Sequence, residues 1–483
     1  MLSDGLKYQD SRMATCEEMK QDLAPFALHD AAAKSKGGPV LLRDGDTVYT
    51  DPSDSHSLIV GDTGSMKTLR FVLPLIYSCA AADESMVIVD PKGELARKSE
   101  SFLSAKGYKT VIINMRDPQR SPDTWNPMGV IERAYKSGEE GQQKAVLQLN
   151  DMLNDIFFRR VDTKDPYWNE SAGQLALGIC LLLLALGEKL NMKNLLKWRY
   201  EKLADGTLDK CFRNLPTDGE IYQNLAGYLG MTAENTKSCI RSTFDQLVRV
   251  FKSAPALTEM LNDTSFDIER IGEAKAAVFV VIPDEKTTFH FLATLFISQC
   301  YTTLLETAER HGGSLPRRTN IILEEFCNLP ALGDIVPMIT AARSRNIRLH
   351  MVIQSYGQLV EKYGENVSRA ILDNCGNMIY LHTREMDFLT YISRLAGNNE
   401  YGRPLISTSR LQRLQKNETV IFHSRCCPYL AEDVPLIFDY PIKLGTELRS
   451  APPKPKKEKK RRRIGDVLKP PELSGDTDAW DWS

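Results

Sequence analysis

The sequence lacks the cysteine and histidine patterns that build metal or disulfide sites. Its ten cysteines are scattered along 483 residues with no Cys-x-x-Cys pair, and its seven histidines show no ligand spacing with Cys or Glu. Zinc ribbons and thioredoxin-like redox chemistry are therefore excluded. Reduced thiols fit a cytosolic compartment, and a chain of this length can bury a core without cross-links.

Long apolar segments are also missing. The first ten residues contain no apolar stretch of the kind that marks a secretory signal. The longest apolar run, Leu175–Leu186, has 12 residues, whereas a membrane-spanning helix needs about 20. We therefore expect a soluble chain without a signal peptide or a transmembrane segment.

No charge of one sign dominates, and the formal net charge of −2 indicates no nucleic-acid partner. This average conceals one local feature, because residues 451–463 contain eight Lys/Arg and one Glu, a net charge of +7 that leaves −9 for the rest. Such a run is usually a solvated tail. The alternative is that the basic run binds DNA or an acidic membrane surface nonspecifically. The acidic end, which carries Trp480 and Trp482, could instead dock a partner.

Strands and helices alternate along most of the chain, which predicts an α/β fold with a mostly parallel sheet. A long helical stretch without strand signals interrupts the alternation, and we interpret it as an inserted all-α domain. The expected units are a polar, irregular N-terminal segment (1–50), an α/β domain in two parts (51–130 and 268–445), an all-α domain (131–267) and a disordered tail, first basic and then acidic (446–483).

One motif lies between an apolar strand and an amphipathic helix, the position that a phosphate-binding loop requires. Its expected nucleotide-binding residues are Gly61, Asp62, Thr63, Gly64, Ser65, Met66, Lys67 and Thr68. The backbone N–H groups of such a loop and the helix N-terminus attract phosphate. Lys67 would reach the β- and γ-phosphates of ATP, and the Thr68 hydroxyl would hold Mg²⁺. Pro74 would kink or offset the helix that follows.

Met66 stands where the pattern GxxxxGK[ST] has glycine. Glycine at this position lets the backbone approach phosphate without a side chain, so methionine would reduce affinity. Two alternatives stay open beside a working site. The loop could exist but bind nucleotide weakly or not at all, or the segment could be an ordinary Gly/Ser turn before a helix.

A second motif is the apolar strand Ile321-Ile-Leu-Glu-Glu325, which ends in two carboxylates as a Walker B strand does. Glu324 would order Mg²⁺ and Glu325 would activate the attacking water. The usual first acid is Asp, and Glu324 is one methylene longer. The alternative is an ordinary strand end with two solvated acids.

Three further residues have both a functional and an ordinary interpretation. Arg343 could be an arginine finger for a neighbouring subunit or a solvated surface residue. Gln354, at the carboxyl end of a strand, could sense the γ-phosphate or have no role. Asp90, at another strand end, could face the nucleotide or belong to a turn.

These motifs, in this order, resemble the type IV coupling proteins of bacterial conjugation, the TraG/TraD group of conjugative DNA-transfer ATPases. The resemblance extends over about residues 10–440 and is much more specific than any one motif. Beside the phosphate loop it is carried by Ser11-Arg-Met-Ala-Thr15, Asp90-Pro-Lys-Gly-Glu94, Trp125-Asn-Pro127, Asp165-Pro-Tyr-Trp168, Leu323-Glu-Glu-Phe-Cys-Asn-Leu329, Ala342-Arg-Ser-Arg345, Ile353-Gln-Ser355 and Ala370-Ile-Leu-Asp-Asn-Cys375.

The resemblance implies a RecA-like P-loop NTPase domain, a homo-hexameric ring, and partners that include single-stranded DNA, a relaxase or relaxosome and type IV secretion channel components. ATP in such rings lies between subunits. The resemblance therefore assigns Arg343 as a finger in trans, Gln354 as γ-phosphate sensor, Glu325 as catalytic base and Glu324, with Thr68, as the metal site.

Members of this family usually carry an N-terminal membrane anchor, and none is visible here. The chain could be a truncated form or a naturally soluble form, or its anchor could be a separate polypeptide. We expect the protein at the inner face of the cell membrane. Three functions stay open: an ATP-driven coupling protein, a non-hydrolysing substrate-receptor platform with a degraded loop, and an FtsK/HerA-like DNA translocase. Retention of Lys67, Thr68, Glu325, Arg343 and Gln354 favours the first.

Overall fold

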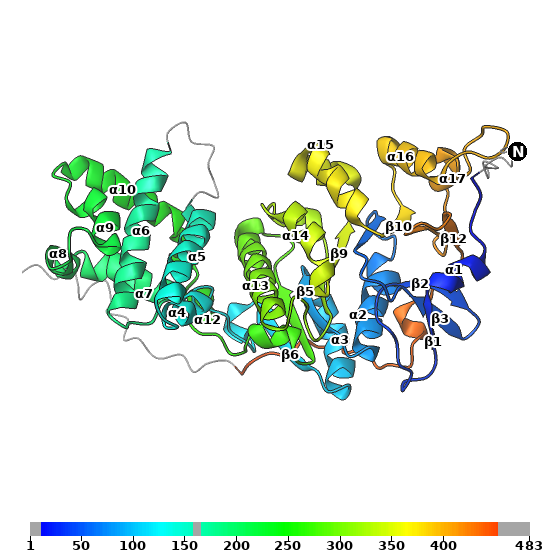
Figure 1. The fold of residues 1–483 in the computed structure, drawn as a ribbon, viewed down its shortest axis with the longest axis horizontal. Coiled ribbons are helices and arrows are strands. Elements are labelled where there is room, and N and C mark those ends of the chain that lie inside the picture. Colours follow the sequence, from blue (N-terminus) through cyan, green and yellow to red (C-terminus); the bar gives the residue numbers. More distant parts are fainter. Residues whose placement is uncertain (1–10, 158–165, 453–483) are drawn as a thin grey trace, which may run out of the picture.

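A nine-stranded sheet forms the centre of the protein in the computed structural model, which describes residues 11–157 and 166–452 (Figure 1). The strand order is β12-β11-β10-β4-β9-β8-β5-β7-β6. Neighbours from β10 to β6 pair in parallel, and β11 and β12 add an antiparallel edge. The strands are β4 (Ser57–Gly61), β5 (Ser85–Asp90), β6 (Lys109–Asn114), β7 (Ala276–Val281), β8 (Thr319–Leu323), β9 (Ile347–Ile353), β10 (Asn377–His382), β11 (Thr419–His423) and β12 (Tyr429–Ala431). The predicted α/β fold with a mostly parallel sheet is confirmed.

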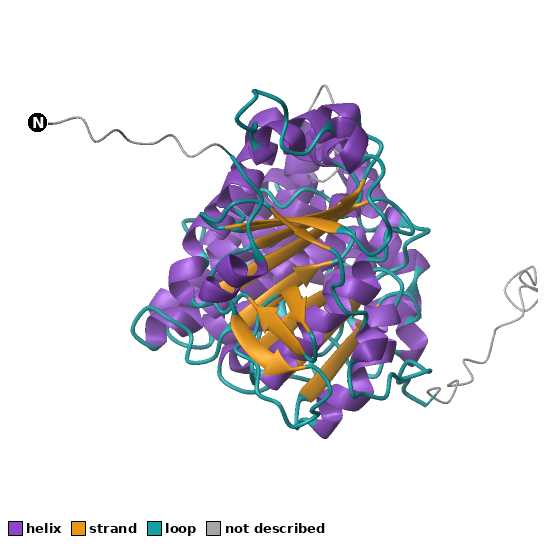
Figure 2. Cartoon of the chain, turned by 90° about the vertical axis from the view of Figure 1, so that its right-hand side faces the viewer, coloured by secondary structure: helices purple, strands orange, loops and turns teal. Residues whose placement is uncertain are grey.

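Helices cover both faces of this sheet, which explains why its central strands are continuous apolar runs (Figure 2). One face packs against α2 (Leu73–Ala81) and α3 (Glu94–Ala105). The other face packs against the helices α13 (His290–Arg310), α14 (Ile335–Ala341), α15 (Tyr356–Asn374), α16 (Met386–Ala396) and α17 (Thr408–Leu411).

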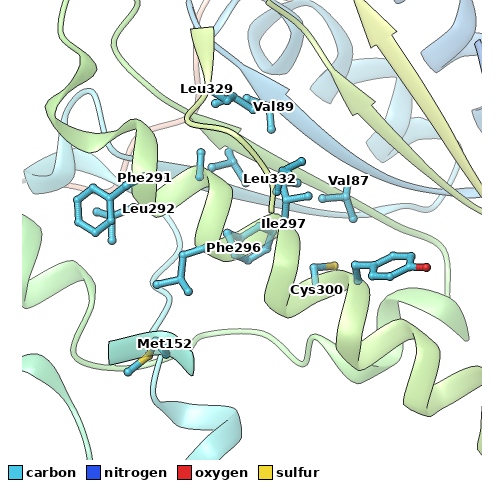
Figure 3. Close-up of a cluster of buried hydrophobic side chains, with 14 of the residues drawn as sticks. Val87, Val89, Met152, Phe291, Leu292, Phe296, Ile297, Cys300, Leu329 and Leu332 are labelled. Atoms are coloured by element: carbon cyan, nitrogen blue, oxygen red, sulfur yellow. The ribbon is translucent and has the colours of Figure 1, made fainter. Parts of the chain in front are cut away.

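The predicted helical insertion lies between β6 and β7. The described residues of this stretch contain helical elements and no strand. The α-helices are α4 (Gly129–Tyr135), α5 (Glu139–Phe157), α6 (Tyr167–Ala185), α7 (Met192–Lys197), α8 (Thr207–Arg213), α9 (Glu220–Leu229), α10 (Glu234–Leu247), α11 (Arg249–Ser253) and α12 (Pro255–Met260). They gather at the left of Figure 1. Their core is continuous with that of the sheet, because Met152 of α5 lies near Phe291, Leu292 and Phe296 of α13 (Figure 3).

Helix α6 is the one described helix that is long and apolar enough to cross a membrane by length and composition. Within the helical insertion it packs against α5, α9 and α10, and 67% of its most apolar window is buried. This is the pattern of a core helix, because the apolar surface faces other parts of the same chain rather than the outside.

The prediction of an irregular segment for residues 1–50 is wrong for residues 16–27 and 40–50. They form a three-stranded antiparallel sheet of β1 (Ala24–Ala27), β3 (Thr47–Thr50) and β2 (Val40–Asp44), preceded by α1 (Cys16–Asp22). Strands β2 and β3 are joined by a tight turn at Gly45, whose φ is 58°. The Asp44-Gly45 pair between two short apolar runs is a hairpin signal, but the strands are too short to stand out by pattern.

The end of the described chain runs along α3 instead of leaving the body at residue 446. Arg449 forms ion pairs with Glu100 and Asp123, and the Ala451 N–H donates to the carbonyl of Arg120, 3.0 Å away. The expected tail therefore cannot begin before Pro452. The rest of the basic run and the acidic end lie outside the described residues.

Candidate nucleotide-binding site

The loop Gly61–Thr68 joins the carboxyl end of β4 to a helix, as predicted. The helix begins with a π-helical turn, Thr68–Val72, in which the Leu73 N–H donates to Thr68 O, and it continues as α2. Pro74 lies in the first turn of α2, where a residue without an N–H is tolerated. At Gly61 a Cβ would lie 2.5 Å from Ser65 Oγ, which means that the loop folds back tightly onto its first residue.

Met66 has a left-handed backbone conformation, with φ at 69°. A side chain at such a position costs about 1–2 kcal/mol relative to glycine, because Cβ crowds the following carbonyl. Gly64, two residues earlier, is also left-handed with φ at 85°. The loop therefore keeps a glycine-type backbone at position 66 although the residue there is methionine.

The Lys67 side chain lies inside the loop. Its ammonium donates to the carbonyl oxygens of Gly61 and Asp62, the latter at 3.0 Å. Burial lowers the pKa of Lys67, while nearby carboxylates, of which Glu325 is the strongest, oppose the shift. A cation held among backbone carbonyls is poised to exchange them for the oxygens of an anionic ligand.

The two predicted motifs meet at Thr68 and Glu324. The Thr68 hydroxyl donates to Glu324 Oε1 over 2.7 Å. Burial, and then the charge of Asp90, raise the pKa of Glu324 to about 8. The described residues contain no group of three His, Cys, Asp or Glu side chains that could hold a metal. A cation here would therefore be shared with water or with a ligand's oxygens, which is how Mg²⁺ is usually bound.

Glu325 and Gln354 are brought together from the ends of neighbouring strands β8 and β9. Gln354 Nε2 donates to Glu325 Oε2 over 2.8 Å, and Gln354 Oε1 accepts from Thr63 Oγ1 at 3.4 Å. Glu325 is itself left-handed, with φ at 53°. Such strained non-glycine residues concentrate at functional sites. The three side chains connect the phosphate loop to both strand ends.

Arg343 lies apart from the other predicted residues. It begins the 3₁₀ turn Arg343–Arg345 that precedes the amino end of β9, and its Nη2 donates to Asp54 over 3.0 Å. Asp54 precedes β4, whereas the loop follows β4. At about 3.3 Å per residue the two ends of the five-residue strand β4 are about 16 Å apart, so Arg343 lies at the end of the strand opposite the loop of its own chain.

Asp90 stabilises the turn that leads into α3. This agrees with the second of its two predicted roles, a residue of an ordinary turn. Its buried carboxylate accepts the backbone N–H groups of Glu94 and Ala96, at 3.1 and 2.9 Å, at the start of α3. Burial raises its pKa to about 6. Asp90 nonetheless affects the site, since its charge is one reason why Glu324 retains a proton.

Strand β10 also contributes to the site, and no sequence motif pointed to it. His382, at its carboxyl end, contacts the Asp62 carboxylate through Nδ1 at 2.9 Å, and its carbonyl accepts the Asp62 N–H. Next to this contact lies a cavity of about 430 Å³. Its lining comes from the loop and from the ends of β9 and β10: Asp62, Thr63, Gln354, Ser355, Gln358, Thr383, Arg384 and Glu385.

The comparisons with known proteins agree on one family. The model of the family described as "Type IV secretory system Conjugative DNA transfer" matches residues 9–426. The conjugal transfer protein TraG of Rhizobium radiobacter is 22% identical over 419 residues, covering 83% of this chain and 62% of TraG. VirD4 of Agrobacterium fabrum is 23% identical over 385 residues, covering 76% of this chain and 53% of VirD4. The chain thus spans about three fifths or less of the length of these relatives.

Solved structures of similar fold include those of the conjugative coupling protein TrwB. A trigonal form of TrwBdeltaN70 with sulphate has a TM-score of 0.64 at 15% identity, covering 91% of this chain and 96% of that one. TrwB with ADP and Mg²⁺ has a TM-score of 0.63 at 16% identity, with coverage of 92% and 96%. The fold is shared over nearly the whole length, so the RecA-like architecture with a helical insertion applies to this chain.

Proposed function

The chain belongs to the family of conjugative DNA-transfer proteins of type IV secretory systems, and we propose that it is a Mg²⁺-dependent ATPase that couples ATP hydrolysis to DNA transfer. One observation carries the proposal: the Thr68 hydroxyl of the phosphate loop is hydrogen-bonded to Glu324 at the end of β8. This contact brings the loop Gly61–Thr68 against an acidic strand end, and a phosphate-binding loop beside such an acid is the arrangement that phosphoryl transfer needs.

The residues present fit a magnesium nucleotide. In the proposed complex Lys67 leaves the carbonyls of Gly61 and Asp62 and binds the terminal phosphates. Thr68 and Glu324 hold the hydrated ion, which neutralises charge on the phosphate oxygens when bound. Glu324 would then lose the proton that its raised pKa favours.

The chemistry at the γ-phosphate would involve residues at the ends of β8 and β9. Glu325 accepts the proton of the attacking water, and Gln354 orients the Glu325 carboxylate through the bond to Oε2. Arg343 is too far from the loop of its own chain, so in this proposal it stabilises the transition state in a neighbouring copy. A ring, a homo-hexamer by family resemblance, would bring the two together.

The partners follow from family membership and are part of the proposal. TrwB has been solved with a non-hydrolysable ATP analogue as well as with ADP and Mg²⁺, which supports ATP and Mg²⁺ as ligands of this chain. The proposed macromolecular partners are single-stranded DNA, a relaxase or relaxosome, type IV secretion channel components and a separate membrane anchor. The proposed location is the inner face of the cell membrane.

The test is DNA-stimulated ATP hydrolysis by the purified chain, compared with Lys67→Ala and with Lys34→Ala. Lys34 is an exposed lysine on another part of the surface that pairs with Asp83. We expect hydrolysis by the wild type and the Lys34 variant and loss in the Lys67 variant. Equal rates for the wild type and Lys67→Ala at high protein concentration would overturn the ATPase proposal.

A second candidate is favoured by Met66. A left-handed methionine in the loop costs conformational energy and places a side chain where glycine is usual. In that case the protein would be a non-hydrolysing platform that receives the transfer substrate. Nucleotide binding without hydrolysis, in the presence of DNA and Mg²⁺, would support this second function over the first.

A further inference from the structure

The turn that carries Arg343 has a fixed backbone. It ends at Asn346, which is left-handed with φ at 62°. The Asn346 side chain donates to the carbonyl of Leu315 over 3.1 Å and accepts from Arg318 Nε over 2.9 Å. Only the side-chain torsions of Arg343 are therefore free to set the direction of its guanidinium.

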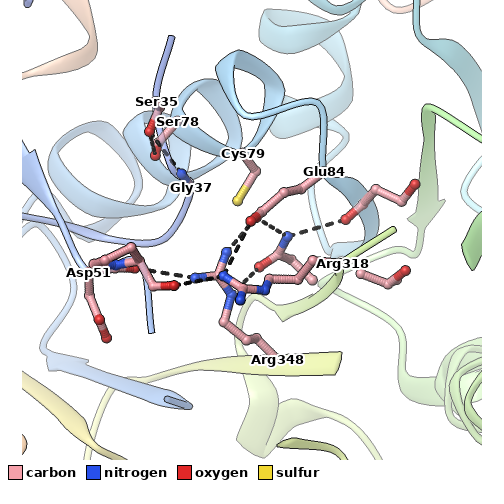
Figure 4. Close-up of polar contacts among 12 residues, drawn as sticks. Ser35, Gly37, Asp51, Ser78, Cys79, Glu84, Arg318 and Arg348 are labelled. Carbon is pink, nitrogen blue, oxygen red and sulfur yellow. Dashed lines mark hydrogen bonds and ion pairs between the residues drawn. The ribbon is translucent and has the colours of Figure 1, made fainter. Parts of the chain in front are cut away.

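Segment 51–56, which faces this turn, is held just as firmly by a buried polar cluster (Figure 4). Arg348, 1% exposed, pairs with buried Glu84 and donates to the carbonyls of Asp51 and Ser53 at 3.2 and 3.1 Å. Arg318 donates to the carbonyl of Pro52 over 2.8 Å. Because breaking a buried charge pair is costly, this cluster keeps the segment in place.

His56 ties the same segment to the helix that leads to Arg343. Its Nδ1 accepts the backbone N–H of Leu349 at 3.0 Å, so the proton is on Nε2, which donates to the carbonyl of Ile339 in α14 at 2.7 Å. Burial lowers the pKa of His56 to about 4, which keeps this neutral form over the physiological range. The segment and the turn are therefore fixed relative to each other.

Asp54 is the side-chain partner that the described residues provide for Arg343. Their side chains are 47% and 50% exposed, and Arg343 Nη2 donates to Asp54 Oδ1 over 3.0 Å. An ion pair this exposed contributes only about 0–1 kcal/mol to stability. Its geometric effect is larger, because one fixed carboxylate holds one guanidinium nitrogen while the other N–H groups remain available to a ligand.

We infer that Asp54 is a positioning residue that aims Arg343 at the nucleotide bound by a neighbouring copy. This rests on the proposed function, in which Arg343 acts in trans. Asp54 itself does not touch the nucleotide. Its role is to hold the guanidinium in the direction that reaches the neighbour's γ-phosphate, so that this ordering is complete before the reaction begins.

The test compares the ATPase kinetics of Asp54→Ala, Asp54→Glu, Arg343→Ala and the double variant. We expect Asp54→Ala to lower kcat about two- to fivefold, the most that an exposed pair of this kind can contribute, with KM for ATP little changed because binding in the loop is untouched. Asp54→Glu should recover part of the rate. The double variant should be no slower than Arg343→Ala, because Asp54 acts only through that arginine.

A matched control is Glu259→Ala in the helical insertion. It removes an ion pair of similar exposure, in which Lys193 Nζ lies 3.2 Å from Glu259 Oε2 and the two side chains are 56% and 50% exposed. This variant should hydrolyse ATP at the wild-type rate. A wild-type rate for Asp54→Ala beside a slow Arg343→Ala would overturn the positioning role alone. A wild-type rate for Arg343→Ala would overturn the proposed finger and the positioning role together.

Discussion

Gln354 holds the carboxylate of Glu325: its Nε2 donates to Glu325 Oε2 over 2.8 Å, across the ends of two neighbouring strands. The same amide accepts from Thr63 in the phosphate loop. A side chain that touches both the loop and the proposed base can report the state of the nucleotide to that base.

Replacing Gln354 with alanine should separate binding from hydrolysis. Without its hydrogen bond the Glu325 carboxylate loses its orientation, so kcat should fall about tenfold or more while nucleotide affinity stays close to that of the wild type. Gln358→Ala is the control, since Gln358 lines the same cavity without a bond to Glu325. Equal loss in both variants would contradict a specific link between Gln354 and the base.

Glu324 should make stability pH-dependent in the absence of nucleotide and Mg²⁺. Its pKa is about 8 in the folded protein and about 4.3 in an unfolded chain. Between these values the folded state keeps a proton that the unfolded state has lost, so the free energy of unfolding should fall as pH rises from 5 to 8.

Glu324→Gln cannot ionise and should show a flatter pH dependence in thermal unfolding between pH 5 and 8. Asp90 titrates in the same range, so the difference between variant and wild type is the quantity to measure. Added Mg²⁺ and nucleotide should stabilise the wild type more than the variant. A slope as steep in the variant as in the wild type would contradict the raised pKa.

Met66→Gly should relieve the left-handed strain in the loop. We expect it to bind nucleotide at least as tightly as the wild type, and to raise the free energy of unfolding by up to about 1 kcal/mol. Met66→Ala keeps the backbone penalty and should behave like the wild type. Weaker binding by the glycine variant would show that methionine is adapted to this site.

Truncation after Pro452 should weaken binding to single-stranded DNA. It leaves the packed segment that ends at Ala451 intact and removes most of the basic run. Loss of phosphate contacts should make the dependence of affinity on salt less steep. Unchanged affinity and salt dependence would mean that the basic run does not bind DNA.

The loop and the two strand ends are predictable from sequence because parallel strands present their carboxyl ends at one edge of a sheet. That rule places Lys67, Glu325 and Gln354 at the same edge, and the order β4-β9-β8 makes them neighbours. Strand order, however, is not encoded in a local pattern. The contact between Asp62 and His382 depends on β10 lying beside β4, although the two residues are 320 positions apart in the chain.

The choice of hydrogen-bond partner is also not predictable from sequence. Asp90 follows a strand as Glu324 does, yet its carboxylate turns to the N–H groups of α3, and no spacing distinguishes the two cases. The left-handed backbone of Met66 is equally hidden, because methionine rarely adopts that conformation. In both cases the surrounding fold decides.

Mixing two inactive variants tests whether a second copy of the chain completes the ATPase site. Lys67→Ala removes the lysine proposed to bind phosphate, and Arg343→Ala removes the arginine proposed to act in trans. We predict that each variant alone hydrolyses ATP slowly and that an equal mixture recovers activity. About a quarter of its interfaces should pair the intact loop of an Arg343→Ala copy with the intact arginine of a Lys67→Ala copy. An equal mixture of folded, assembled variants that stays as inactive as each variant alone would mean that no second copy completes the site.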